Sequence, residues 1–259
     1  MICKVVNLTL HKETFIMVWG TFGAAHIATL VFAVALNIAL FFILKKCPQK
    51  TQVIVLGILS LSGIAAIIYN LGSWESPLEY LPLHLCSLNA MVLPFAVFTR
   101  NKVLGNLTLL WSLGAAMALI LNHSIADAEL GGHVFCFYYF PHVFEASIPI
   151  LLFKLGLCKL DAKCIFSTVG ISAAVYTAVH MLNLKINEYC KENDIVDWAG
   201  EIIDVNYMYS MAPDNPLLDL FYEWIPIPFW YMFPVIPIVL IYLGAIYGIA
   251  ALRNKRKAA

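Results

Sequence analysis

Four polar side chains lie close together at the start of an apolar segment, in the run Leu-Pro-Leu-His-Leu-Cys-Ser-Leu-Asn at residues 81–89. Polar groups inside a membrane are costly, so those that do occur there are candidates for function. Of the thiol, imidazole, hydroxyl and carboxamide in this run, the Cys86 thiol is the best nucleophile, provided that a nearby base or positive charge favours the thiolate. Pro82 suits the first turn of a helix, which places Cys86 about one turn inside the segment.

The composition explains why this segment is assigned to a membrane. Of the 259 residues, 61% are hydrophobic and 12% are charged, and the mean hydropathy is +0.82, whereas about 25% of the residues of a soluble domain are charged. The formal net charge is zero, so no overall field favours a nucleic-acid partner. The seven cysteines show no CxxC or other metal-ligand spacing, which argues against a disulfide framework and a zinc site.

Seven apolar runs are long enough to cross the roughly 30 Å hydrocarbon layer of a bilayer. We therefore predict an all-α fold, a polytopic membrane protein whose single transmembrane domain (1–259) is a seven-transmembrane-helix bundle. The predicted spans are 21–44, 52–72, 81–99, 103–122, 134–157, 163–184 and 226–252, with a long outer loop at 185–225. The amphipathic stretch 195–205 of this loop predicts a short interfacial helix.

Loop charges orient the predicted bundle. Lysine and arginine follow the first, third, fifth and seventh spans, whereas the loops on the other side carry mainly aspartate and glutamate. By the positive-inside rule, the N-terminus lies outside and the C-terminus is cytoplasmic.

This topology places all seven histidines in the outer half of the bundle: His11, His26, His84, His123, His133, His142 and His180. His26 lies about one turn inside the first span, and His180 lies near the outer end of the sixth. Glu145, the only carboxylate placed well inside a span, follows His142 by three residues and shares its helix face. These positions predict one polar cavity that opens toward the outer leaflet.

Within this cavity the Cys86 thiol and the His142 imidazole lie at nearly the same depth on two inward-running spans. The arrangement allows His142 to act as the base for Cys86, with Glu145 as a third group that orients the ring. Asn89 shares a face with Cys86 and can donate to an oxyanion, while His84 points about 200° away and is the weaker base. Each residue also has a structural reading: a membrane cysteine is usually a small packing residue, and a membrane histidine is often a hydrogen-bonded strut.

Several motifs together resemble the YwaF-like bacterial integral membrane proteins. They are Leu-Pro-Leu-His-Leu-Cys at 81–86, His26, His142, Asn-Tyr-Met-Tyr at 206–209 and Asn-Pro-Leu-Leu-Asp at 215–219. That family is distantly similar to a eukaryotic transmembrane acyltransferase that moves polyunsaturated acyl chains between phospholipids to make ether phospholipids. The resemblance covers all seven predicted spans.

The resemblance implies an acyl-transfer dyad of Cys86 and His142 that works through a thioester without a cofactor or metal. Its partner is a membrane phospholipid or lysophospholipid, the acyl group passes to a lysolipid or to water, and the location is a bacterial plasma membrane. Asn206 and Tyr207 belong to the motifs, and Trp230 near the start of the last span is a further substrate-binding candidate. The family often has Gly-Pro-Trp-Pro-Trp-Tyr there, whereas this chain has Glu-Trp-Ile-Pro-Ile-Pro-Phe-Trp-Tyr at 223–231. The resemblance therefore does not determine the shape of the entrance to the site.

Three other readings remain. The first is a transporter or proton-coupled binding protein whose cavity histidines relay protons or hold solute, although no inverted repeat is visible. The second is metal or haem binding by His26, His84, His142 and His180, which lacks the usual ligand spacings. A retinal-type receptor is the least favoured, because the last span at 226–252 has no lysine for a Schiff base.

Overall fold

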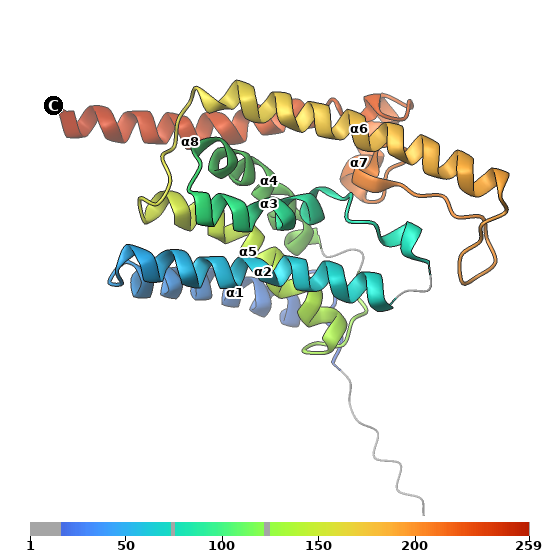
Figure 1. Cartoon of the computed structure of the whole chain (residues 1–259), viewed down its shortest axis with the longest axis horizontal. Coiled ribbons are helices and arrows are strands. Elements are labelled where there is room, and N and C mark those ends of the chain that lie inside the picture. Colours follow the sequence, from blue (N-terminus) through green and yellow to red (C-terminus); the bar gives the residue numbers. More distant parts are fainter. Residues whose placement is uncertain (1–16, 74–75, 122–124, 259) are drawn as a thin grey trace, which may run out of the picture.

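The chain folds into helices joined by short turns, with one long irregular connection before the last helix (Figure 1). A computed structural model describes residues 17–73, 76–121 and 125–258, so His11 and His123 lie outside the described residues. No strand forms among them apart from two isolated bridges. The elements are α1 (Ala24–Leu44), α2 (Gln49–Ser73), η1 (Pro77–Tyr80), α3 (Leu85–Thr99), α4 (Lys102–Leu121), α5 (His133–Lys154), α6 (Cys164–Glu192), η3 (Tyr207–Tyr209), α7 (Pro216–Trp224), η4 (Trp230–Met232) and α8 (Val235–Ala258).

The prediction of an all-helical integral membrane protein is confirmed. Six segments of the described chain are long and apolar enough to span a bilayer: α1, α2, α4, α5, α6 and the stretch Trp230–Ala250 that leads into α8. The remaining apolar helix, α3, has 15 residues, which is about 22 Å at 1.5 Å per residue. The seven-span count and the orientation of the termini therefore stay predictions.

The third predicted span, 81–99, begins later than expected. Leu81, Pro82 and Leu83 precede the helix, and His84 is its extended N-cap residue, with φ −70° and ψ 153°. The prediction that Pro82 lies in the first helical turn is therefore wrong. The cause is a distant contact, because the Tyr207 hydroxyl donates to the Leu78 carbonyl and accepts from the Leu81 N–H at 3.1 Å.

The connection between the last two long helices also differs from expectation. Helix α6 continues to Glu192 rather than ending near 184. The helix predicted at 195–205 is wrong: this stretch folds back as a tight turn with an antiparallel bridge between Val196 and Ile202. The Asp197 carboxylate holds the turn because it accepts two backbone N–H groups.

The short helix of this region is α7, which the sequence encodes locally. The Asn215 side chain caps it by accepting the Leu218 N–H at 3.2 Å, and Pro216 occupies the first helical position. Both residue types are favoured at these positions of a helix start.

Helices α2, α3, α4 and α5 form the packed centre of the molecule, and α6 joins it through α4. Small residues let the central helices approach closely, as is common in membrane bundles. A Cβ atom placed on Gly63 of α2 would lie 2.5 Å from the Ala90 Cβ of α3, and one on Gly105 of α4 would lie 2.5 Å from the Cys158 sulfur.

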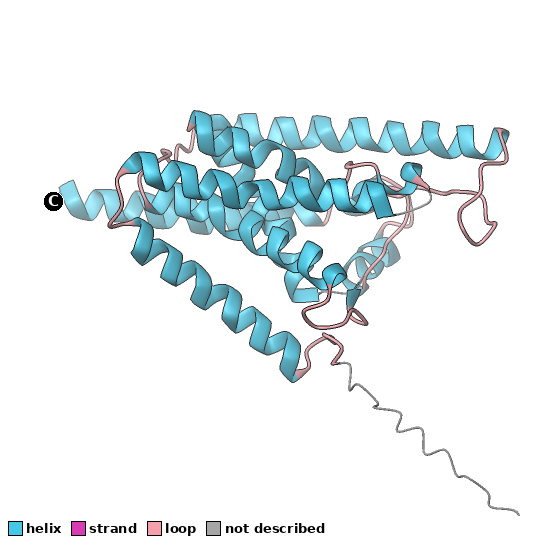
Figure 2. Ribbon diagram, turned by 60° about the horizontal axis from the view of Figure 1, so that its bottom comes forward, coloured by secondary structure: helices cyan, strands magenta, loops and turns pink. Residues whose placement is uncertain are grey.

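Helix α1 stands apart from this centre and contacts α5 more than any other helix. Figure 2 shows α1, the helix that follows the grey N-terminal trace, leaning away from the other helices. The opening between α1, α4 and α5 is a groove with a volume of about 690 Å³.

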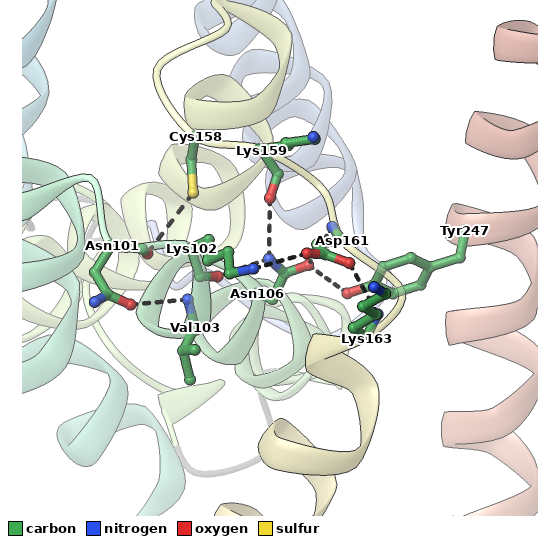
Figure 3. Close-up of polar contacts among 9 residues, drawn as sticks. All are labelled: Asn101, Lys102, Val103, Asn106, Cys158, Lys159, Asp161, Lys163 and Tyr247. Atoms are coloured by element: carbon green, nitrogen blue, oxygen red, sulfur yellow. Dashed lines mark hydrogen bonds and ion pairs between the residues drawn. The ribbon is translucent and has the colours of Figure 1, made fainter.

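A polar network joins the turns after α3 and α5 to α8 at one end of the bundle (Figure 3). Lys102 and Asp161 form an ion pair of 2.9 Å. The Asn106 side chain donates to the Lys102 and Lys159 carbonyls and accepts from the Tyr247 hydroxyl. Because these partners belong to three chain segments, which are α4, the turn after α5 and α8, the network fixes this end of the bundle.

Candidate functional site

Cys86 lies in the first turn of α3 and is partly exposed. The unpaired N–H groups and the positive end of the helix dipole favour a negative charge at this position. A thiol in apolar surroundings stays protonated, so Cys86 still needs a base to become a good nucleophile.

The base candidate, His142, lies on α5, which contacts α3 directly. Its Nδ1 atom is 2.7 Å from the Tyr138 carbonyl oxygen, one helical turn earlier. A carbonyl oxygen only accepts hydrogen bonds, so Nδ1 carries the proton and the Nε2 lone pair is left for base chemistry. The His142 ring also stacks on the Tyr138 ring at 4.2 Å, which limits its rotation.

Helices α3 and α5 pack directly against each other. Cys86 lies near enough to Tyr138 and Glu145 of α5 for a charge on its sulfur to act on both side chains, and Glu145 is likewise within electrostatic range of the His142 ring. The sequence predicts that Glu145 orients His142, whereas in the structure the Tyr138 carbonyl occupies Nδ1. The third member of the candidate triad is therefore a backbone carbonyl.

Asn89 and Glu145 form a second, deeper polar pair. Asn89 is completely buried and Glu145 is 4% exposed. The two side chains are neighbours, yet neither polar atom of Asn89 nor Oε2 of Glu145 makes a regular hydrogen bond within the described chain. Buried groups of this kind usually have a partner, so this pair has free capacity for a water molecule or for part of a substrate.

A strained turn lies beside Cys86. Met208 and Tyr209 both have left-handed φ angles, 54° and 53°, and Tyr209 interacts electrostatically with Cys86 and Asp214. The Met208 N–H donates to Nδ1 of His84 at 3.4 Å, so this nitrogen is occupied and His84 serves the turn rather than the thiol. Left-handed non-glycine residues cost about 1–3 kcal/mol each and persist only where the surroundings hold them.

Helix α6 supplies that hold through a stripe of polar side chains. Asn183 donates to the Tyr207 carbonyl and to the Ser210 hydroxyl, both at 2.9 Å, and accepts the Tyr207 N–H. His180 forms a hydrogen bond of 3.0 Å with Ser210. His180 therefore acts on the position of Tyr209 and does not reach Cys86 by any described contact.

The motif residues Asn206 and Tyr207 support the same turn. The Asn206 carboxamide accepts from the Met211 N–H and donates to the Ala212 carbonyl, which closes a local loop. Tyr207 is 1% exposed, and its hydroxyl holds the segment before α3. Together these residues join the 206–210 turn to the start of the helix that carries Cys86.

His26 and Trp230 lie elsewhere. Both ring nitrogens of His26 are occupied, by the Phe22 N–H at 2.9 Å and the Leu119 carbonyl at 2.8 Å, so this buried histidine is a strut between α1 and α4. The Trp230 side chain is half-exposed and packs on Phe233. Its neighbour Tyr231 is the buried residue, and its hydroxyl donates to the Tyr209 and Ala212 carbonyls.

Sequence reasoning missed Tyr138 and Tyr209 as members of the site. Tyr138 precedes His142 by four residues, a spacing that places both on one helix face, so this signal was present. Tyr209 lies within the 206–209 motif, but its position depends on the left-handed turn, which could not be predicted from the sequence. Among the described residues, no group of three histidine, cysteine, aspartate or glutamate side chains is arranged to hold a metal.

Comparison with known proteins gives one match. The sequence pattern of the TMEM164 family matches residues 21–247, a range that runs from the predicted start of the first span into α8. This is the eukaryotic transmembrane family that the sequence motifs indicated as the more distant relative, and the YwaF-like assignment stays a prediction. No curated protein and no solved structure matches the chain.

Proposed function

Since the chain belongs to the TMEM164 family, we propose that it is a membrane enzyme that transfers or hydrolyses acyl groups of phospholipids, with Cys86 as nucleophile and His142 as base. The observation that carries this proposal is the state of the His142 ring. Its Nδ1 proton is held by the Tyr138 carbonyl, which leaves Nε2 as the basic nitrogen on a helix that packs directly against the one carrying Cys86.

In the first half of the reaction, Nε2 of His142 takes the thiol proton while the Cys86 sulfur attacks the ester carbonyl carbon. The tetrahedral intermediate then breaks its carbon–oxygen bond, and the leaving lysolipid oxygen receives the proton from His142. The acyl group stays on Cys86 as a thioester. The Tyr138 carbonyl stabilises the imidazolium that forms between the two proton transfers.

In the second half, a lysophospholipid hydroxyl attacks the thioester and gives its proton to His142, which returns it to the departing Cys86 sulfur. Water in place of the hydroxyl gives hydrolysis. The free carboxamide of Asn89 lies one turn from Cys86 on α3 and can donate to the oxyanion of either intermediate. The scheme needs no cofactor or metal.

The same proposal includes the predicted topology. We place the site toward the outer leaflet of a plasma membrane, bacterial in location as the motifs imply, with α3 as a seventh membrane segment and the C-terminus in the cytoplasm. The positive-inside distribution of lysine and arginine supports this orientation.

The test is acyl exchange in proteoliposomes, followed by lipid mass spectrometry. Cys86→Ala should abolish exchange and also abolish labelling by a lipid-like, thiol-reactive electrophile. Cys136→Ala is the matched control, because Cys136 is another partly exposed thiol, and it should retain both. Full exchange and undiminished labelling in Cys86→Ala would contradict the proposal.

The buried polar atoms of Asn89 and Glu145 that lack a regular hydrogen bond favour one alternative function, a proton-coupled transporter. A buried carboxyl with free hydrogen-bonding capacity is a common proton carrier in membrane proteins. The two functions separate in one variant: Glu145→Gln removes proton carriage by this residue, whereas the Cys86–His142 chemistry keeps both of its reacting groups. Loss of solute uptake together with undetectable acyl exchange in the parent protein would favour the transporter.

A further inference from the structure

The groove between α1, α4 and α5 lies on a different side of α5 from Cys86. Its volume is about 690 Å³, within the 300–1,000 Å³ range of small-molecule sites. Residues of three helices line it, including Ala33, Asn37 and Phe41 of α1, Leu119 of α4, and Val143 and Ser147 of α5.

The groove wall suits a hydrocarbon chain. Its two central polar side chains direct their donors to their own helices: Asn37 donates to the Ala33 carbonyl at 2.8 Å, and Ser147 donates to the Val143 carbonyl at 2.6 Å. The Asn37 Oδ1 atom has no hydrogen-bond partner among the described residues. The rest of the wall is apolar apart from Lys154 at one end. A groove bounded by membrane helices is in contact with lipid, so acyl chains are the apolar molecules with the readiest access to it.

The Lys154 end of the groove is positively charged. Leu44, the last residue of α1, packs in one cluster with Leu151 and Leu152 of α5, so Lys45 and Lys46 come to the same end as Lys154. All three lysines are exposed, and none forms an ion pair within the described residues. Basic pockets between membrane helices at the membrane surface bind anionic lipid headgroups.

We propose that this groove binds an anionic phospholipid, with one acyl chain between α1 and α5 and the phosphate beside Lys154. The charge at the Lys154 end favours this occupant over a transmembrane helix of a second copy, because an anionic headgroup offers the lysines a partner of opposite charge. The groove does not include Cys86, so lipid binding in it can be tested separately from the proposed catalysis.

The test places the full-length protein in nanodiscs that contain phosphatidylglycerol with a photoreactive group on one acyl chain. Cross-linked residues are mapped by mass spectrometry. We expect cross-links to concentrate on the groove side of α1 and α5, at least fivefold above those on the lipid-facing side of α8. Uniform cross-linking over all exposed apolar faces would overturn the proposal.

Two variants test the parts of the site. Ala146→Trp fills the groove, because Ala146 lines it, and should lower groove cross-linking at least fivefold, whereas Ala174→Trp on an exposed position of α6 should not. Lys154→Gln, combined with Lys45→Gln and Lys46→Gln, should lower cross-linking by phosphatidylglycerol at least threefold and leave that by phosphatidylcholine unchanged. Lys191→Gln is the control for charge.

The lysine variants keep the test decisive even if Ala146→Trp fails to fold. No change in cross-linking by these variants would show that phospholipid binding is the wrong assignment.

Discussion

His142 combines two features that a general base needs, a fixed ring and a free nitrogen. The Tyr138 carbonyl supplies the first through a hydrogen bond of 2.7 Å to Nδ1, and the stacked Tyr138 ring adds to it. Because the ring orientation depends on a backbone atom, substitutions of the Tyr138 side chain leave the hydrogen bond in place. The proposed base and the group that orients it can therefore be tested separately.

We expect His142→Gln to lower the rate of acyl exchange by about 10²–10⁴-fold, the usual contribution of a general base. Tyr138→Phe should keep the rate within about threefold, because it removes only the hydroxyl that donates to the Ala118 carbonyl and costs about 1 kcal/mol of stability. Exchange rates at equal amounts of folded protein measure both. Equal rates in His142→Gln and the parent would exclude His142 as the base.

Single residues also show where sequence reasoning reaches its limit. Helix depth and periodicity predict that Cys86, His142 and Glu145 lie at similar depths on two spans, so it could be expected that the helices carrying them are neighbours. The role of His84 could not, since it depends on a turn 124 residues later whose N–H donates to its ring. His26 was likewise indistinguishable from a site residue until its two hydrogen-bond partners were known.

At the scale of elements, the approach of α2 to α3 depends on one missing side chain. A Cβ on Gly63 would meet the Ala90 Cβ at 2.5 Å and Oε1 of Glu145 at 3.0 Å. Such contacts are far closer than van der Waals distance, so α2 would have to move away from both α3 and the Glu145 carboxyl.

We therefore expect Gly63→Ala to destabilise the protein by about 1–3 kcal/mol, the usual cost of overpacking. Gly72→Ala is the matched control on the same helix, where a Cβ meets nothing within 4 Å, and it should be neutral or stabilise by up to about 1 kcal/mol. Thermal unfolding in detergent measures both. A stable Gly63→Ala variant would contradict the close packing of α2 and α3.

The turn between α5 and α6 has a pH dependence of known sign. The Lys102 ammonium, and then the Lys163 backbone N–H, hold the pKa of Asp161 below its usual value. A carboxyl with a lowered pKa in the folded state stabilises that state above its unfolded pKa of about 3.9, and this stabilisation is lost as the pH falls through the folded pKa.

Asp161→Asn should therefore lower the unfolding temperature at pH 7, and its difference from the parent should shrink below about pH 4. Asp127→Asn, at an exposed position in the turn before α5, should show no such convergence. Unfolding curves from pH 7 down to pH 3 measure the effect. A difference that stays constant with pH would rule out the Lys102–Asp161 contact as its origin.

Element boundaries illustrate what local sequence can and cannot predict. Helix α7 carries its own start signal in Asn215 and Pro216, and the long helices follow from their apolar length. The predictions for the start of α3 and for the stretch 195–205 were wrong, because contacts made by Tyr207 and Asp197 determine the structure there. Long-range hydrogen bonds of this kind leave no periodic trace in the sequence.

For the whole molecule, the charge distribution predicts which turns face each compartment. A cysteine introduced by Asn193→Cys, after α6, should react with a membrane-impermeant maleimide on intact cells. One introduced by Lys159→Cys, between α5 and α6, should react only after permeabilisation. The parent chain gives the background from its own cysteines. The reverse pattern would invert the topology, and labelling of both sites on intact cells would contradict a membrane crossing by α6.

The 15 residues of α3 have a consequence for the lipid around them. In the proposed topology α3 crosses the membrane, but its length of about 22 Å is less than the thickness of the hydrocarbon layer, so the bilayer would thin beside it or water would enter at its end. We expect this dip at the α3 N-terminus, next to Cys86. The glycerol esters of a neighbouring lipid would then sink to the level of the sulfur, so the substrate could meet the thiol without being lifted out of its leaflet.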